Sequence, residues 1–178
     1  RSKHDEPIKG EKKYSVLTIH RPSNTDSKEM MTSIIDSLKL IEHDIIFPIH
    51  PRTKKMMHHF QIELPNHIKQ IDPLGYTDML SLVQRAVFVL TDSGGLQKEA
   101  FFLKKQCITF RDTTEWRETL ENGCNTLVLD NPSSLNCDRL QAAIANRKTR
   151  DYKVKQFGNG NAAKEIIGAI KSYFKTNK

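Results

Sequence analysis

The chain has 178 residues and a mass of 20.5 kDa, with 37% hydrophobic and 28% charged residues, a composition typical of one ordinary globular domain. No apolar run approaches the ~20 residues that span a bilayer, and the first residues are charged rather than signal-like, so we predict a cytoplasmic location without membrane contact. The net charge of +7 lies entirely in residues 147–178, with nine Lys or Arg against two acids and no interleaved aromatic motif, which favours a basic last helix over nucleic-acid binding.

Short apolar runs rich in β-branched and aromatic residues recur along the chain and predict six strands. They lie at residues 14–19, 45–49, 68–71, 86–90, 106–110 and 126–129. Segments with helical spacing are expected between most of them, with starts near Thr53, Thr77, Gly94, Ser134 and Asn161.

The first helix has the clearest pattern. Asp26 or Ser27 can cap it, and an apolar stripe follows at helical spacing, formed by Met30, Met31, Ile34, Ile35, Leu38 and Ile41. Six strands alternating with helices predict an α/β fold, a Rossmann-like parallel sheet doubly wound with right-handed crossovers. We find no repeat or long linker and expect residues 1–178 to form a single domain.

Three cysteines without C-x-x-C spacing argue against a disulfide framework. We therefore expect all three to be reduced, with Cys107 packed in a core strand.

Polar and cationic residues follow four of the six predicted strands. These segments are His20-Arg21, His50-Pro51-Arg52, Asp92-Ser93-Gly94-Gly95 and Arg111-Asp112. Ligands of open α/β sheets bind outside the carboxyl ends of the strands, so the fold would bring these groups together at one edge.

The stretch LTDSGGLQKEA at residues 90–100 gives this edge its chemistry. Gly94 and Gly95 would let a phosphate reach the N-H groups of a helix N-terminus, and Ser93 adds a hydroxyl. Glu99 falls one turn later on the same side, where a carboxylate suits the two hydroxyls of a ribose, and Arg111 would supply positive charge. The combination indicates a nucleotide; the alternative is a tight strand-to-helix turn with a solvated Glu99.

Several of these motifs carry a resemblance to a known family. The segments LTIHRPSNTD, FPIHPRTKK, IDPLGYTDMLSLVQRAVFVLTDSGGLQKEA and RDTTEW resemble the C-terminal half of UDP-N-acetylglucosamine 2-epimerases and their close UDP-sugar relatives. The similarity runs from Tyr14 to the FGNGNAAKEI segment. It implies one half of a two-domain fold of the B-type glycosyltransferase kind, with the active site between the domains and the N-terminal domain absent from this sequence.

The resemblance also implies roles for individual residues. Ser93, Gly94 and Gly95 would bind the diphosphate, Glu99 the ribose and Arg111 the phosphates. His20 is implicated in catalysis near the β-phosphate, and Arg21, His50 and Pro73 would complete the UDP site. Met79 stands where some relatives have an aromatic ring, which leaves base stacking open.

The implied reaction is inversion at C2 of the sugar by elimination and re-addition of UDP. The carboxylates that move the proton would lie in the absent domain, so we expect this chain alone to be inactive. The scheme needs no metal or other cofactor, and His58 and His59, adjacent on a helix, cannot form a metal pair. The expected partners are a UDP-sugar, the N-terminal domain and a second subunit of a homodimer, in polysaccharide biosynthesis.

Thr114, Glu115 and Trp116 mark a departure that bears on specificity. Many relatives read T-E-R-P-E where this chain has TEWRE, and the Trp116 version resembles epimerases of more elaborated UDP-sugars. These residues could contact the sugar or pack at an interdomain surface. The competing functions are the donor domain of a UDP-dependent glycosyltransferase and a non-catalytic nucleotide-binding module.

Overall fold

A computed structural model describes residues 13–121, 123–146, 150–152 and 157–176, apart from the side chain of Thr176. Its centre is a six-stranded sheet of order β3-β2-β1-β4-β5-β6 in which every neighbouring pair is parallel. The strands are β1 (Tyr14–Thr18), β2 (Asp44–Pro48), β3 (Ile68–Ile71), β4 (Phe88–Thr91), β5 (Gln106–Thr109) and β6 (Asn125–Leu127). A separate antiparallel pair consists of β7 (Leu129–Asn131) and β8 (Ser134–Leu135).

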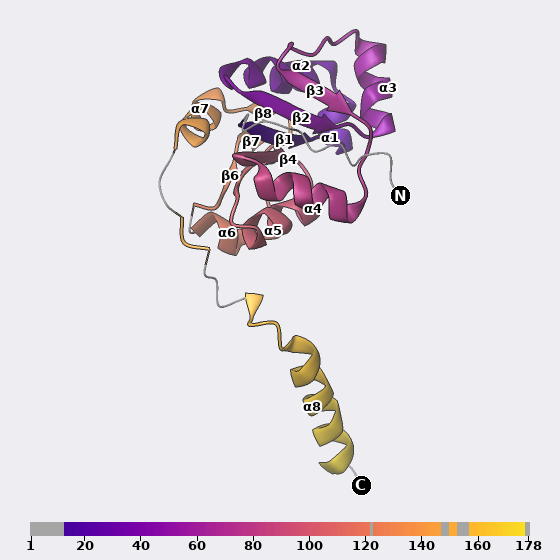
Figure 1. Cartoon of the computed structure of the whole chain (residues 1–178), viewed down its shortest axis with the longest axis vertical. Coiled ribbons are helices and arrows are strands. Elements are labelled where there is room, and N and C mark those ends of the chain that lie inside the picture. Colours follow the sequence, from indigo (N-terminus) through magenta and orange to yellow (C-terminus); the bar gives the residue numbers. More distant parts are fainter. Residues whose placement is uncertain (1–12, 122, 147–149, 153–156, 177–178) are drawn as a thin grey trace.

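Helices cover both faces of the sheet (Figure 1). The helices of the described residues are α1 (Pro22–Thr25), α2 (Lys28–Ser37), α3 (Pro51–Phe60), α4 (Tyr76–Arg85), α5 (Gly94–Phe102), α6 (Arg117–Glu121), α7 (Cys137–Ala145) and α8 (Ala162–Thr176), with a short 3-10 turn η1 at Leu38–Leu40. One core cluster joins the sheet to α2, α3 and α7, and a second joins it to α4 and α5. The predicted doubly wound α/β fold is confirmed.

Alternation along the strands explains the two cores. Leu17 of β1 packs into the first core and Val16 into the second, because successive side chains of a strand point to opposite faces. All five residues of β1 are buried, as expected for a strand covered on both sides. Cys107 lies in the second core as predicted, and burial raises the pKa of its thiol to about 12.

The first predicted helix is also confirmed. Ser27 is the N-cap, its hydroxyl oxygen accepting the Met30 N-H at 3.2 Å. The predicted apolar stripe is buried along its whole length, from Met30 to Ile41.

Several boundaries differ from the prediction. The strand predicted at residues 126–129 ends at Leu127, since the chain then turns into the β7–β8 hairpin. The helix expected near Ser134 begins only at Cys137, because Ser134 pairs with Asn131 in that hairpin and Asn136 caps α7 by accepting the Arg139 N-H at 2.8 Å.

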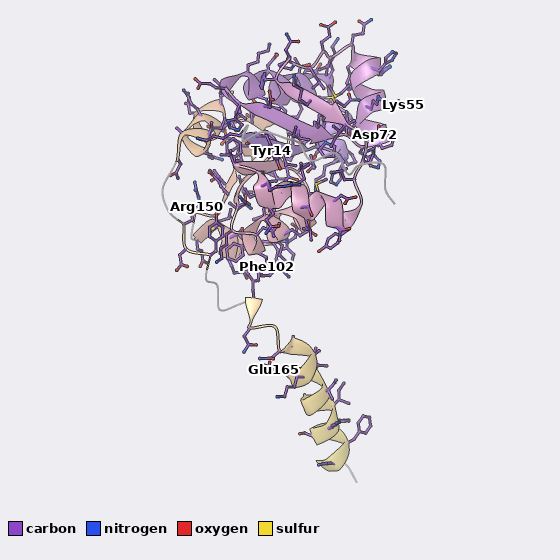
Figure 2. All side chains as sticks on the ribbon, viewed as in Figure 1. Tyr14, Lys55, Asp72, Phe102, Arg150 and Glu165 are labelled. Atoms are coloured by element: carbon purple, nitrogen blue, oxygen red, sulfur yellow. The ribbon has the colours of Figure 1, made fainter. Side chains whose placement is uncertain are left out.

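The last helix extends away from the rest of the molecule (Figure 1). Its side chains project into solvent, Glu165 near its start among them (Figure 2), and every residue of α8 whose side chain is described is exposed. Within the described ranges no helix is both long enough and apolar enough to cross a membrane.

The strand order places a topological switch point between β1 and β4. Chain progression runs from β1 towards β3 on one side and from β4 towards β6 on the other. In such sheets the loops diverge at this point and leave a crevice beyond the carboxyl ends of the two strands.

Candidate functional site

A pocket of about 340 Å³ opens at this switch point. Its polar lining comes from the ends of β1, β2 and β4 and from the first turns of α5: Thr18, His20, His50, Ser93, Gly95 and Glu99. The remaining lining is apolar: Ile19, Pro48, Pro73, Leu74, Met79 and Leu96. A mostly apolar cavity with a few converging polar groups is the usual form of a small-molecule site.

The N-terminus of α5 forms one wall. Ser93 is its N-cap and accepts the Leu96 N-H at 3.4 Å, which leaves the hydroxyl hydrogen of Ser93 available to a ligand. Gly95 is exposed, and a Cβ placed there would have Ser93 Oγ at 3.9 Å as its nearest described contact outside its chain neighbours and the helix backbone. The backbone of this turn is therefore open to an anion, which the helix N-terminus attracts.

Glu99 lies one turn further along α5 and lines the same pocket. Among the described residues its carboxylate has no hydrogen-bond or ion-pair partner. The spacing of four residues puts Glu99 on the same helix face as Gly95, so a ligand that reaches both must offer an anion and, about one turn away, hydrogen-bond donors.

Asp92 holds the loop that carries His20. Its buried carboxylate accepts the N-H groups of His20 and Arg21 at 3.0 and 2.9 Å, and the Asn24 side-chain amide at 3.0 Å. His20 Nδ1 lies 3.3 Å from Asp92 Oδ1. A proton on Nδ1 facing this carboxylate leaves Nε2 of a neutral His20 as the free nitrogen.

His50 caps the next helix. Its Nδ1 accepts the Arg52 N-H at 3.2 Å at the start of α3. Because Nδ1 is an acceptor, the proton of the neutral ring is on Nε2, and the ring presents an N-H donor at the pocket.

Arg111 lies beside the pocket, not in its lining. Its guanidinium binds both oxygens of Glu115, at 2.7 and 2.9 Å, and Arg21 approaches the same carboxylate at 3.7 Å. These hydrogen bonds from Arg111, with a further backbone hydrogen bond, lower the pKa of Glu115 to about 2. A Cβ on Gly94 would lie 3.2 Å from Glu115 Oε2, so this carboxylate rests against the first residue of α5.

Thr114 and Trp116 also contact α5 from outside the pocket. Thr114 donates to Gln97 Oε1 at 2.6 Å, and the Trp116 indole N-H donates to the Gly94 carbonyl at 2.8 Å. The loop after β5 therefore packs behind the helix whose other side lines the pocket.

The structure thus divides the predicted site residues into two groups. It brings His20, His50, Pro73, Ser93, Gly95 and Glu99 into one pocket lining. Arg21, Gly94, Arg111, Thr114, Glu115 and Trp116 form an adjacent layer around the start of α5.

Sequence reasoning did not assign a role to Asp92. The sequence does contain a signal for it, since Asp92 lies directly between a buried strand and the Ser-Gly-Gly turn. A carboxylate at this position is removed from water and therefore needs hydrogen-bond donors from the protein. Within the described part of the chain, no three His, Cys, Asp or Glu side chains are grouped as metal ligands would be.

Comparison with known proteins agrees with this geometry. A family model described as UDP-N-acetylglucosamine 2-epimerase matches residues 1–171. The chain belongs to this family. A UDP-N-acetylglucosamine 2-epimerase homolog of Methanococcus maripaludis is 39% identical over 174 residues, which cover 94% of this chain and 47% of that protein.

Two further family members bear on ligand and specificity. The crystal structure of the Methanocaldococcus jannaschii enzyme in complex with UDP-GlcNAc and UDP superposes with a TM-score of 0.74 at 37% identity, over 90% of this chain and 46% of that one. The UDP-2,3-diacetamido-2,3-dideoxy-D-glucuronate 2-epimerase of Pseudomonas aeruginosa is 44% identical over 118 residues, 65% of this chain and 33% of that protein. The chain therefore spans less than half the length of these relatives.

Proposed function

We propose that this chain is the nucleotide-binding, C-terminal half of an enzyme that inverts C2 of UDP-N-acetylglucosamine or a related UDP-N-acetyl sugar. Family membership supports the epimerase reading over a glycosyltransferase donor domain. A relative crystallised with UDP-GlcNAc and UDP supports the choice of ligand. Which sugar is bound would depend on the other half of the site.

One observation carries the proposal. An open helix N-terminus at Ser93 and Gly95 and the carboxylate of Glu99, which has no partner among the described residues, line the same pocket, one turn apart. The diphosphate and the ribose are adjacent in UDP and match these two protein groups. The diphosphate is an anion that a helix N-terminus binds, and the ribose offers two hydroxyl donors to a carboxylate. The apolar lining at Pro73, Leu74 and Met79 then faces the base.

The same groups would assist the chemistry. In elimination, a base on the other half would remove the C2 proton, the electron pair of the C2–H bond would form a C1–C2 double bond, and UDP would depart with the electron pair of its bond to C1. A proton would then return to the opposite face of C2 while a UDP oxygen adds back to C1 and the double bond is consumed. Negative charge develops on the diphosphate in the transition state, where the α5 N-H groups and the Ser93 hydroxyl stabilise it more than in the intact substrate. His20, held by Asp92, would donate a hydrogen bond or a proton to the leaving group when its ring is protonated.

The proposal is tested by calorimetric titration of the 178-residue chain with UDP and with uridine at moderate salt. We expect saturable UDP binding, much weaker uridine binding, and a loss of about tenfold in UDP affinity in Glu99→Ala, since charged hydrogen bonds contribute about 1.5 kcal/mol or more. Glu42→Ala is the matched control. Glu42 lies just before β2, at the amino ends of the strands, whereas the pocket lies at their carboxyl ends.

Absence of UDP binding by a folded wild-type chain, or equal affinity in Glu99→Ala, would contradict this assignment. The epimerase step itself requires the full-length protein. Formation of a glycoside with an acceptor, and no C2 epimer without one, would favour the glycosyltransferase alternative.

A further inference from the structure

The helix that forms the anion site has two contact faces. Gly95, Leu96 and Glu99 line the pocket. Gly94, Gln97 and Lys98 instead contact the loop at residues 114–116. At 100° per residue these two sets lie on different sides of the helix, so the loop binds the side of α5 turned away from the ligand.

Trp116 makes the contact nearest the anion site. Its indole N-H donates to the carbonyl of Gly94 at 2.8 Å, and Gly94 is the first residue of α5. A Gly-Gly pair has more backbone freedom than any other dipeptide, so a hydrogen bond to this carbonyl fixes a peptide that would otherwise rotate easily. The same planar peptide carries the N-H of Gly95, which points the opposite way, towards the open N-terminus of the helix.

The indole ring is itself held from several directions. Lys98 Nζ lies 4.3 Å from its centroid, and the Phe157 ring contacts it edge-on at 6.1 Å. The Trp116 N-H donates to Thr114 Oγ1 at 3.1 Å, and the Trp116 carbonyl accepts the Thr119 hydroxyl at 2.7 Å. Lys98 lies one turn after Gly94, so the Trp116 side chain contacts both ends of the first turn of α5.

A buried polar chain fixes the same loop to the same helix. Gln97 is fully buried, and its Oε1 accepts from the Thr114 hydroxyl at 2.6 Å and from the Asn125 amide at 3.0 Å. Asn125 in turn accepts the Thr109 hydroxyl at 2.7 Å. The loop, β5, β6 and α5 are thereby joined on the side away from the pocket, so movement of Trp116 would be transmitted to the anion site.

We propose that Trp116 is a positioning residue which, through the Gly94 carbonyl and the Lys98 stack, holds the first turn of α5 in the orientation that binds the diphosphate. The inference rests on the proposed function for the identity of the anion. It gives Trp116 a role within this chain that involves no contact with the sugar. Because electrostatic stabilisation depends on donors aimed in advance, small rotations of this turn weaken anion binding without unfolding the domain.

The test compares Trp116→Phe with Phe102→Leu in the 178-residue chain. Trp116→Phe keeps an aromatic ring for Lys98 and removes the N-H donor together with the small difference in volume between indole and phenyl. Phe102 belongs to the same aromatic cluster, is 56% exposed on the surface of the domain (Figure 2), and makes no contact with Gly94 in the described structure. UDP and uridine affinities are measured by titration, and exchange of the Leu96 and Gln97 amides is followed by NMR without ligand.

We expect Trp116→Phe to weaken UDP binding about fivefold to tenfold, the effect of one hydrogen bond, while uridine affinity changes less than about twofold. Exchange of the two amides accelerates in the absence of ligand. Phe102→Leu behaves as wild type in all three measurements. A purely structural role would instead weaken UDP and uridine binding together.

Unchanged UDP affinity in Trp116→Phe, or equal losses for UDP and uridine, would overturn the inference. A wild-type chain that binds neither ligand would refute the proposed function alone. In that case the amide exchange decides on Trp116: faster exchange in Trp116→Phe but not in Phe102→Leu supports the positioning role, and identical exchange refutes it.

Discussion

Gly95 has no side chain, although its own surroundings do not require a glycine. Its backbone is not in the left-handed region, and the nearest heavy atom to a methyl group placed on its Cα would be Ser93 Oγ at 3.9 Å, an ordinary contact. Under the proposed function, this free backbone would serve a ligand that approaches the helix N-terminus.

Gly95→Ala should consequently separate stability from binding. We expect the free energy of unfolding to stay the same or rise by up to ~1 kcal/mol, because alanine favours the helix and restricts the unfolded chain. UDP affinity should fall about tenfold, since the methyl group would occupy space that the diphosphate needs. Urea unfolding and calorimetry measure the two effects.

Gly168→Ala is the matched control for this change. Gly168 is an exposed glycine in α8, a Cβ added to it would have nothing within 4 Å, and it lies outside the pocket lining. This substitution should leave UDP affinity unchanged. A Gly95→Ala chain that binds UDP as tightly as wild type would remove Gly95 from the site.

At the residue scale, the sequence predicted which residues share the pocket better than it predicted their individual contacts. His20 and Ser93 could be placed there because a parallel sheet gathers its strand ends, and Glu99 because it lies one turn further along the helix after Ser93. The partnership of Arg111 with Glu115 could not be read in the same way, since two residues four apart in a loop have no fixed relative direction. Asp92 was missed because its role consists of hydrogen bonds to a backbone segment about 70 residues away in sequence.

At the scale of elements, Glu115 stabilises the loop after β5 through its ion pair with Arg111 in the same loop. Hydrogen bonds from Arg111 lower the pKa of this carboxyl to about 2, from 4.5. A pKa depressed in the folded state contributes stability that is present above pH ~4.5 and is lost as the pH falls towards ~2. The side chain is 54% exposed, so solvent screening limits the contribution to less than ~1 kcal/mol.

Glu115→Gln should therefore be less stable than wild type at pH 7, with a difference that shrinks as the pH falls from about 4.5 towards about 2, where the carboxyl of the unfolded chain and then that of the folded chain is protonated. Urea unfolding at several pH values measures this difference. A stability difference that stays constant over the range would show that the Arg111–Glu115 pair does not hold the loop.

The positions of the helices and strands could be predicted from the apolar pattern of the sequence, whereas several of their boundaries could not. β4 begins at Phe88, two residues later than predicted, because α4 runs through Arg85 and Ala86 is its C-cap. The β7–β8 hairpin was missed for a different reason. Its strands are three and two residues long, too short to show a periodicity.

At the scale of the whole molecule, α8 contrasts with the domain. Large apolar side chains on this helix are 51–65% exposed: Ile166, Ile167, Ile170, Tyr173 and Phe174. The sequence pattern correctly predicted a helix there, but periodicity alone cannot say whether an apolar stripe packs against the same domain.

Removal of residues 162–178 should thus leave the domain intact. We expect the free energy of unfolding to change by less than ~0.5 kcal/mol and UDP affinity to stay within about twofold. The reason is that every described side chain of α8 is exposed. Urea unfolding of the shortened chain measures the first quantity. A loss of stability of several kcal/mol would mean that α8 packs on the domain in solution.

The most direct test of the proposed site is a crystal structure of the 178-residue chain with UDP. We predict diphosphate oxygens about 3 Å from the Gly95 N-H and the Ser93 hydroxyl, ribose hydroxyls on Glu99, and the base against Pro73 and Met79. UDP bound outside this pocket, or in the reverse orientation with its base at the start of α5, would contradict the assignment of the site.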